Sequence, residues 1–60
     1  MKAKVTFEIY TPDDCLEVEF MEWLRYELQI DSSISTENPL VDYELSLYEN
    51  GRNIQIDITQ

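Results

Sequence analysis

The sequence predicts a single α+β domain with the element order strand, helix, strand, strand. Residues 2–11 alternate apolar and polar side chains, which is typical of a half-buried strand. Residues 12–30 change to a helical period. Residues 40–60 alternate again on both sides of Asn50-Gly51, a strong hairpin signal. With 60 residues, the chain is expected to form one domain over residues 1–60, because it is too short for two cores.

The strand over 2–11 has two distinct faces. Its apolar side chains are Ala3, Val5, Phe7 and Ile9. Its other face carries Lys2, Lys4, Thr6, Glu8 and Tyr10. Because successive side chains point to opposite faces of a strand, the apolar set is expected to face the core.

The helix over 12–30 has a start signal and an apolar stripe. Thr11 is a favoured N-cap, Pro12 suits the first helical position, and Asp13 and Asp14 suit the first turn. The predicted core stripe consists of Leu16, Phe20, Trp23, Leu24 and Leu28. Residues 31–39 are polar, end in Asn-Pro and are predicted to form a loop.

The hairpin over 40–60 is predicted to turn at Asn50-Gly51, since a type I′ turn needs positive φ at both central residues. This turn sets a register in which Tyr43, Leu45 and Leu47 face inward against three isoleucines. The same register places Glu44 opposite Asp57 on the outer face. The predicted sheet has three antiparallel strands in the order 1-3-2, with the helix on one face.

Composition excludes several function classes. Thirteen acidic and four basic residues give a net charge of −9, which argues against direct binding to nucleic acid or to anionic membranes. Histidine is absent and the one cysteine, Cys15, has no intrachain disulfide partner, as expected in a reducing cytoplasm. No apolar stretch is long enough to span a membrane. We therefore expect a cytoplasmic protein.

Motifs of catalysis are also missing from the sequence. It contains no glycine-rich phosphate loop, no Gly-x-Ser-x-Gly and no Cys–His pair, and Asp31 to Ser35 lacks the ligand spacing of a calcium loop. A two-layer domain of this size also offers no evident cleft that could separate the pKa values of two carboxyl groups. The sequence thus predicts no enzyme, no cofactor and no metal site.

Acidic side chains form two predicted clusters. Glu19 and Glu22 are expected on the outer side of the helix, with Tyr26 one turn further. Like charges directly opposite each other destabilise a sheet, so the predicted pair of Glu44 and Asp57 calls for a reason: either exposed acids keep an edge-rich sheet from aggregating, or they bind a partner. That second cluster, on the open sheet face, consists of Asp42, Glu44 and Asp57, with Tyr48 as an aromatic anchor.

Rows of carboxylates at these spacings can imitate the charges of a DNA backbone. The predicted function is therefore inhibition of a DNA-binding or DNA-processing enzyme, whose basic groove is the partner. Of the two clusters, the sheet cluster is preferred. The alternative is an ordinary interaction module or a homodimer that uses the open sheet face or an edge strand. A DNA mimic should lose affinity steeply with salt, whereas a sheet-face dimer should not.

In size, charge and predicted element order the chain resembles small acidic proteins encoded early by bacteriophages. That group includes anti-restriction proteins, anti-CRISPR proteins and uracil-DNA glycosylase inhibitors. Ser32-Ser33-Ile34 is similar to a Glu-Ser-Ile element of one such glycosylase inhibitor, with Ser32 in the place of the Glu. The resemblance implies a host-inhibitor role in the cytoplasm of an infected cell.

Overall fold

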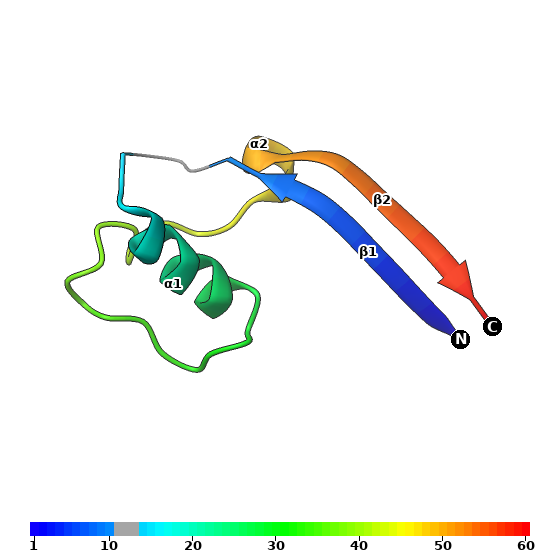
Figure 1. Cartoon of the computed structure of the whole chain (residues 1–60), viewed down its shortest axis with the longest axis horizontal. Coiled ribbons are helices and arrows are strands. Elements are labelled where there is room, and N and C mark those ends of the chain that lie inside the picture. The colour runs from blue at the N-terminus through cyan, green and yellow to red at the C-terminus, as the bar shows by residue number, and fades with distance from the viewer. Residues whose placement is uncertain (11–13) are drawn as a thin grey trace.

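The computed structural model describes residues 1–10 and 14–60. The element order is β1 (Lys2–Ile9), α1 (Glu17–Glu27), α2 (Leu47–Asn50) and β2 (Gly51–Thr59). β1 and β2 form a two-stranded antiparallel sheet, called the ribbon below. Residues 14–50, which contain α1, α2 and the loop between them, are called the head. The ribbon extends away from the head, and both chain termini lie at its tip (Figure 1).

The prediction of a three-stranded sheet is wrong. β1 does pair antiparallel with the last strand, as the predicted order requires, but residues 41–46 form no strand and residues 47–50 form a helical turn. Ser46 caps this turn, because its hydroxyl accepts a hydrogen bond of 3.3 Å from the Glu49 backbone N–H. The alternating pattern of residues 41–48 is therefore overridden by a local helix signal.

The predicted Asn50-Gly51 hairpin turn is also wrong. Asn50 ends α2, and Gly51 has a φ of −97°, which any residue can adopt. Glycine is required at this position for space: a Cβ atom on Gly51 would lie 2.7 Å from the Leu47 carbonyl oxygen. The chain thus enters β2 directly from α2, pressed against the backbone of that helical turn.

Ribbon pairing brings apolar side chains together across the strands. Val5 lies opposite Ile56, and Ala3 lies opposite Ile58. Between Thr6 and Glu8 the register shifts by one residue, so that Asn53 and Ile54 both oppose Phe7. Asn53 takes up the extra residue with a φ of 55°, in the left-handed region that asparagine tolerates better than most residues.

Helix α1 is shorter than predicted. It begins at Glu17 and ends at Glu27, so Asp14 and Cys15 precede it, and the predicted cap Thr11 with Pro12 and Asp13 lies outside the described residues. At its C-terminus, Gln29 adopts a φ of 63° and the Ile30 N–H reaches the Arg25 carbonyl at 2.9 Å. This is the hydrogen-bond pattern of a Schellman motif with glutamine in place of the usual glycine.

The core lies within the head, between α1 and the loop that follows it. Trp23 is 1% exposed and Leu40 is fully buried. The Trp23 indole N–H donates to the Tyr43 carbonyl at 3.2 Å, and the Phe20 ring packs edge-on against the indole. Burial of Trp23 was predicted correctly. The loop predicted over 31–39 is confirmed too, since no helix or strand lies between residues 28 and 46.

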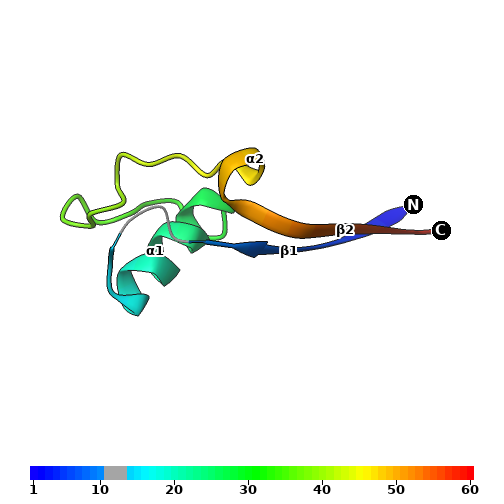
Figure 2. The same cartoon turned by 90° about the horizontal axis from the view of Figure 1, so that it is seen from above.

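The predicted packing of the helix on the sheet is not present. Figures 1 and 2 show α1 beside the base of the ribbon, with the distal half of the ribbon projecting beyond it. The loop after α1 takes the place that the sheet was expected to occupy against Trp23. Tyr43, predicted as a core residue, is 42% exposed, and the hydrogen bond that it makes to the indole uses its backbone carbonyl.

Candidate partner-binding surface

The predicted sheet cluster does not assemble. Asp57 lies in β2 directly opposite Lys4, while Glu44 lies in the loop that precedes α2. The predicted like-charge pair of Glu44 and Asp57 is therefore wrong, because the strand expected to carry Glu44 does not form. Asp57 instead belongs to a cross-strand pair of opposite charges, which is a favourable arrangement.

The two carboxylates of the predicted helix cluster accept hydrogen bonds from other parts of the head. Glu19 and Glu22 were expected to face outward, but both are half-buried. Glu19 accepts the Leu16 backbone N–H at 2.9 Å, next to the start of the helix. Glu22 accepts the Asn38 side-chain amide at 2.7 Å and the Ser35 backbone N–H at 3.4 Å. Each of the two carboxylates thus accepts a backbone N–H group that would otherwise be unpaired.

Asn38 completes the attachment of the loop to α1. It is 4% exposed, and its side-chain amide also donates to the Glu19 carbonyl at 3.0 Å. Its side-chain oxygen accepts the Leu40 backbone N–H at 2.8 Å. A buried amide with all these partners fixes Leu40 in the core, since each unmade bond would cost free energy.

Arg25 is the one basic residue of the head. Its guanidinium donates to both carboxylate oxygens of Asp31, at 2.9 and 3.2 Å. This contact lowers the pKa of Asp31, first through the hydrogen bond and also through the positive charge. The pKa of Arg25 is raised for the same reasons.

Three exposed carboxylates remain together on residues 42–49, which we call the acidic segment. They are Asp42, Glu44 and Glu49. Two tyrosines lie among them: Tyr43 is 42% exposed and Tyr48 is 95% exposed. The acidic segment thus combines negative charge with exposed tyrosines, a residue type that is enriched at binding surfaces.

Two side chains of α1 bind the backbone of the acidic segment. The Trp23 indole binds the Tyr43 carbonyl, and Glu27 accepts the Leu45 backbone N–H at 2.7 Å. These contacts use backbone groups and leave the side chains of Asp42 and Glu44 exposed. A surface fixed in this way loses little conformational entropy on binding.

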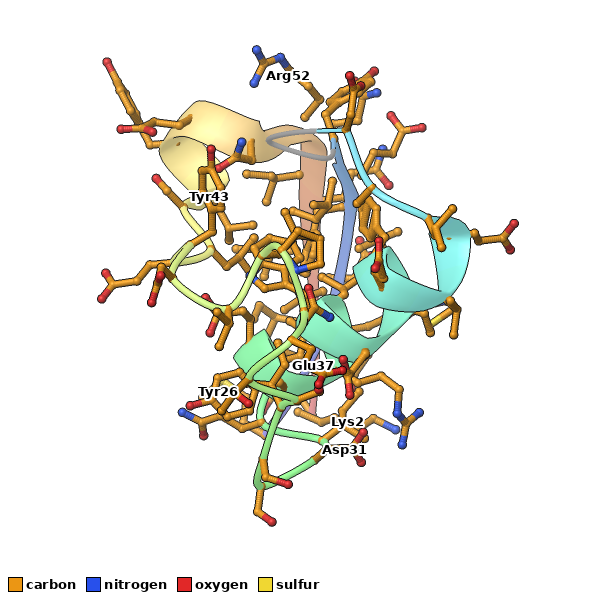
Figure 3. The ribbon with its side chains drawn as sticks, turned by 90° about the vertical axis from the view of Figure 1, so that its left-hand side faces the viewer. Lys2, Tyr26, Asp31, Glu37, Tyr43 and Arg52 are labelled. Carbon is orange, nitrogen blue, oxygen red and sulfur yellow. The ribbon has the colours of Figure 1, made fainter. Side chains whose placement is uncertain are left out.

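Tyr26 lies elsewhere. It is half-buried and lines a shallow hollow of about 450 Å³ together with Ile30 and Asp31. Figure 3 shows Tyr26 and Asp31 at one end of the head and Tyr43 toward the other. Of the seven predicted binding residues, three lie on the acidic segment, namely Asp42, Glu44 and Tyr48. The other four lie on β2 or α1: Asp57, Glu19, Glu22 and Tyr26.

Sequence reasoning missed Glu49 as a member of this surface. The signal was present: Ser46-Leu47-Tyr48-Glu49 has the S-x-x-E spacing of a capping box, which predicts a helix start at Ser46. Recognising it would have placed Glu49 in the first turn of a helix and removed the hairpin.

Other site classes find no support in the described ranges 1–10 and 14–60. No three acidic or cysteine side chains there are grouped as metal ligands. Within the same ranges, no helix is long and apolar enough to cross a membrane. Comparisons with protein-family models, curated proteins and solved structures found no match.

Proposed function

We propose that the chain is a non-enzymatic acidic protein that inhibits a DNA-binding or DNA-processing enzyme by occupying the basic groove for DNA. The observation that carries this proposal is the acidic segment, with three exposed carboxylates and two exposed tyrosines on eight consecutive residues. The host-cell cytoplasm and a bacteriophage origin remain part of the proposal, through the resemblance to small acidic phage proteins.

Charge distribution supports a basic partner. The head contains ten acidic residues and one basic residue, whereas the ribbon contains two acidic and three basic residues. Almost all of the negative charge therefore lies on one part of the molecule. Such a field attracts a positively charged surface and speeds association with it. Strongly basic surfaces, which would attract so acidic a head, are characteristic of proteins that bind nucleic acid.

Four carboxylates of the head outside the acidic segment have partners within the fold. Glu19, Glu22 and Glu27 accept backbone or amide N–H groups, and Asp31 binds Arg25. Asp42 and Glu44 have no such role among the described residues, so their charge stabilises nothing within the head. Exposed like charges on a small domain cost stability, and partner binding is a reason to keep them.

The test is displacement of proteins from DNA. An extract of bacterial cells is passed over DNA-cellulose, and the bound proteins are eluted with the chain. We expect the parent to release a specific DNA-binding protein, because both ligands compete for one groove. Affinity for the released protein should fall steeply as salt is raised, since the contact is between exposed charges.

A pair of variants with the same change in charge locates the contact. Glu44→Lys lies in the acidic segment, and Glu37→Lys changes another exposed carboxylate, in the preceding loop. We expect Glu44→Lys to weaken binding at least about tenfold, because it places like charges face to face. Glu37→Lys should stay near the parent. Equal binding by the parent and Glu44→Lys, or release of nothing from DNA-cellulose, would refute the proposal.

A further inference from the structure

The ribbon has an apolar face that no part of the described residues 1–10 and 14–60 covers. Val5, Ile56 and Ile58 lie on this face and are 51%, 62% and 56% exposed. A two-stranded sheet alone is marginally stable in water, and a sheet is normally stabilised by burying its apolar face against another layer. The distal half of the ribbon therefore needs a covering element.

Helix α1 also has an exposed apolar surface. Cys15, Leu16, Phe20, Met21 and Leu24 line an apolar hollow of about 380 Å³ on its surface, together with Glu17. Leu16 is 65% exposed and Met21 is 55% exposed. This is part of the stripe that the sequence pattern directs toward a sheet. In one chain the two apolar surfaces do not meet, because the distal ribbon projects away from α1 (Figures 1 and 2).

Electrostatics favour contact between the ribbon of one copy and the head of another. The tip of the ribbon, residues 2–5 and 56–59, carries Lys2, Lys4 and Asp57 for a net charge of +1, whereas α1 carries four glutamates and one arginine for a net charge of −3. Two heads would repel each other. An antiparallel arrangement of two chains instead places each cationic tip beside the acidic head of its neighbour.

The dimensions also suit such an arrangement. Nine residues of strand at about 3.4 Å each give a ribbon of about 30 Å, and the whole molecule is 42 Å long. The heads of two antiparallel chains would then lie at opposite ends, separated by more than the Debye length of about 8 Å at physiological salt.

We propose that two copies of the chain exchange ribbons. The distal half of each ribbon, residues 2–5 and 56–59, packs its apolar face on α1 of the other copy, around a two-fold axis. Each half of the dimer then has the two-layer arrangement of helix on sheet that the sequence pattern predicts within one chain. This inference concerns a different surface from the acidic segment and does not depend on the partner proposed for it.

The first test uses the unmodified protein. A sample that mixes isotope-labelled and unlabelled chains is examined by isotope-filtered NMR, which detects contacts between chains only. We expect contacts from the methyl groups of Ile56 and Ile58 to Leu16, Met21 and Leu24. Contacts confined to ribbon against ribbon would overturn the proposal in favour of stacked ribbons. A monomer without contacts between chains would overturn it altogether.

The second test compares neighbouring positions on opposite faces of β2. Ile56→Lys places a charge on the apolar face, and Gln55→Lys places the same charge on the other face, opposite Thr6. Sedimentation at several protein concentrations measures dimer dissociation. We expect Ile56→Lys to raise the dissociation constant at least about tenfold, because an apolar side chain leaves the interface. Gln55→Lys should dimerise like the parent. Equal dissociation constants for the two variants would contradict the proposal.

Trp23 fluorescence shows whether Ile56→Lys keeps the head folded. Should that variant unfold, Lys2→Glu replaces it, since Lys2 lies at the exposed tip opposite the uncharged Thr59. We expect this variant to weaken the dimer most at low salt, because it reverses the net positive charge of the tip and with it the attraction to the head. A dissociation constant unchanged at low salt would count against the exchange.

Discussion

The head is held together by side chains, whereas the ribbon is held together by its backbone. In the head, Glu22, Glu27 and Asn38 bind backbone N–H groups or each other, around the buried Trp23 and Leu40. In the ribbon, the strands satisfy each other's backbone groups, and most side chains are exposed. Side chains satisfy many backbone polar groups of the head, which has a core. Strand pairing satisfies those of the ribbon, which has none.

This difference teaches how so acidic a domain can fold. Part of the negative charge of the head is structural, because glutamates replace the strand partners that the loop lacks. The charge of the acidic segment has no such use among the described residues. A high net charge therefore does not mark every carboxylate as a binding group, and the hydrogen-bond partners separate the two kinds.

Truncation in the two regions should give the largest contrast. Trp23→Ala removes the largest buried side chain of the head and should lower the free energy of unfolding by about 3–5 kcal/mol. Ile56→Ala removes a side chain that is 62% exposed and should cost less than about 1 kcal/mol in the monomer. Urea unfolding followed by circular dichroism, at a concentration where the chain is monomeric, measures both. Equal costs would mean that the ribbon face is covered within one chain.

A change at the junction of the two regions should have an intermediate effect. Gly51→Ala brings a Cβ atom to 2.7 Å from the Leu47 carbonyl oxygen, so α2 and β2 must move apart. We expect a loss of about 1–3 kcal/mol, as for other overpacked sites. Asn50→Ala is the control, because it leaves the backbone bond from the Tyr10 N–H to the Asn50 carbonyl in place. If Asn50 and Gly51 formed a hairpin turn with positive φ at both residues, Asn50→Ala would also lower the stability. A large loss for Asn50→Ala would therefore contradict the junction described above.

The sequence pattern predicts the parts of the fold that depend on local signals. β1, the centre of α1, the loop over 31–39 and the burial of Trp23 follow from alternation, helical period and composition. The antiparallel pairing of the first strand with the last one was predicted as well, from the strand order rather than from a local signal. These signals hold because nothing nearby in the chain competes with them.

The prediction fails where two local signals compete. Residues 41–48 alternate like a strand, but Ser46 and Glu49 also start a helix, and the Trp23 indole and Glu27 bind the backbone of Tyr43 and Leu45. Contacts between residues about twenty positions apart cannot be read from periodicity. The predicted binding cluster was lost with the strand, because its register depended on the Asn50-Gly51 turn.

The smallest effect should come from the exposed ion pair at the end of α1. Because Arg25 lowers the pKa of folded Asp31, the folded state binds the proton of this carboxyl group less readily than the unfolded chain does. The stabilisation is fully present above the unfolded pKa of about 3.9 and is lost as the pH falls through the lower folded pKa. Asp31→Asn should therefore melt at a lower temperature than the parent at pH 7 and at pH 5, and the difference should vanish in stronger acid.

Glu37→Gln is the control, because it removes an exposed carboxylate of the head that has no ion pair among the described residues, and it should show no such loss. Since both members of the pair are about half exposed, added salt should shrink the difference at pH 7. A difference between Asp31→Asn and the parent that persists in strong acid would show that the side chain acts through its hydrogen bonds rather than its charge.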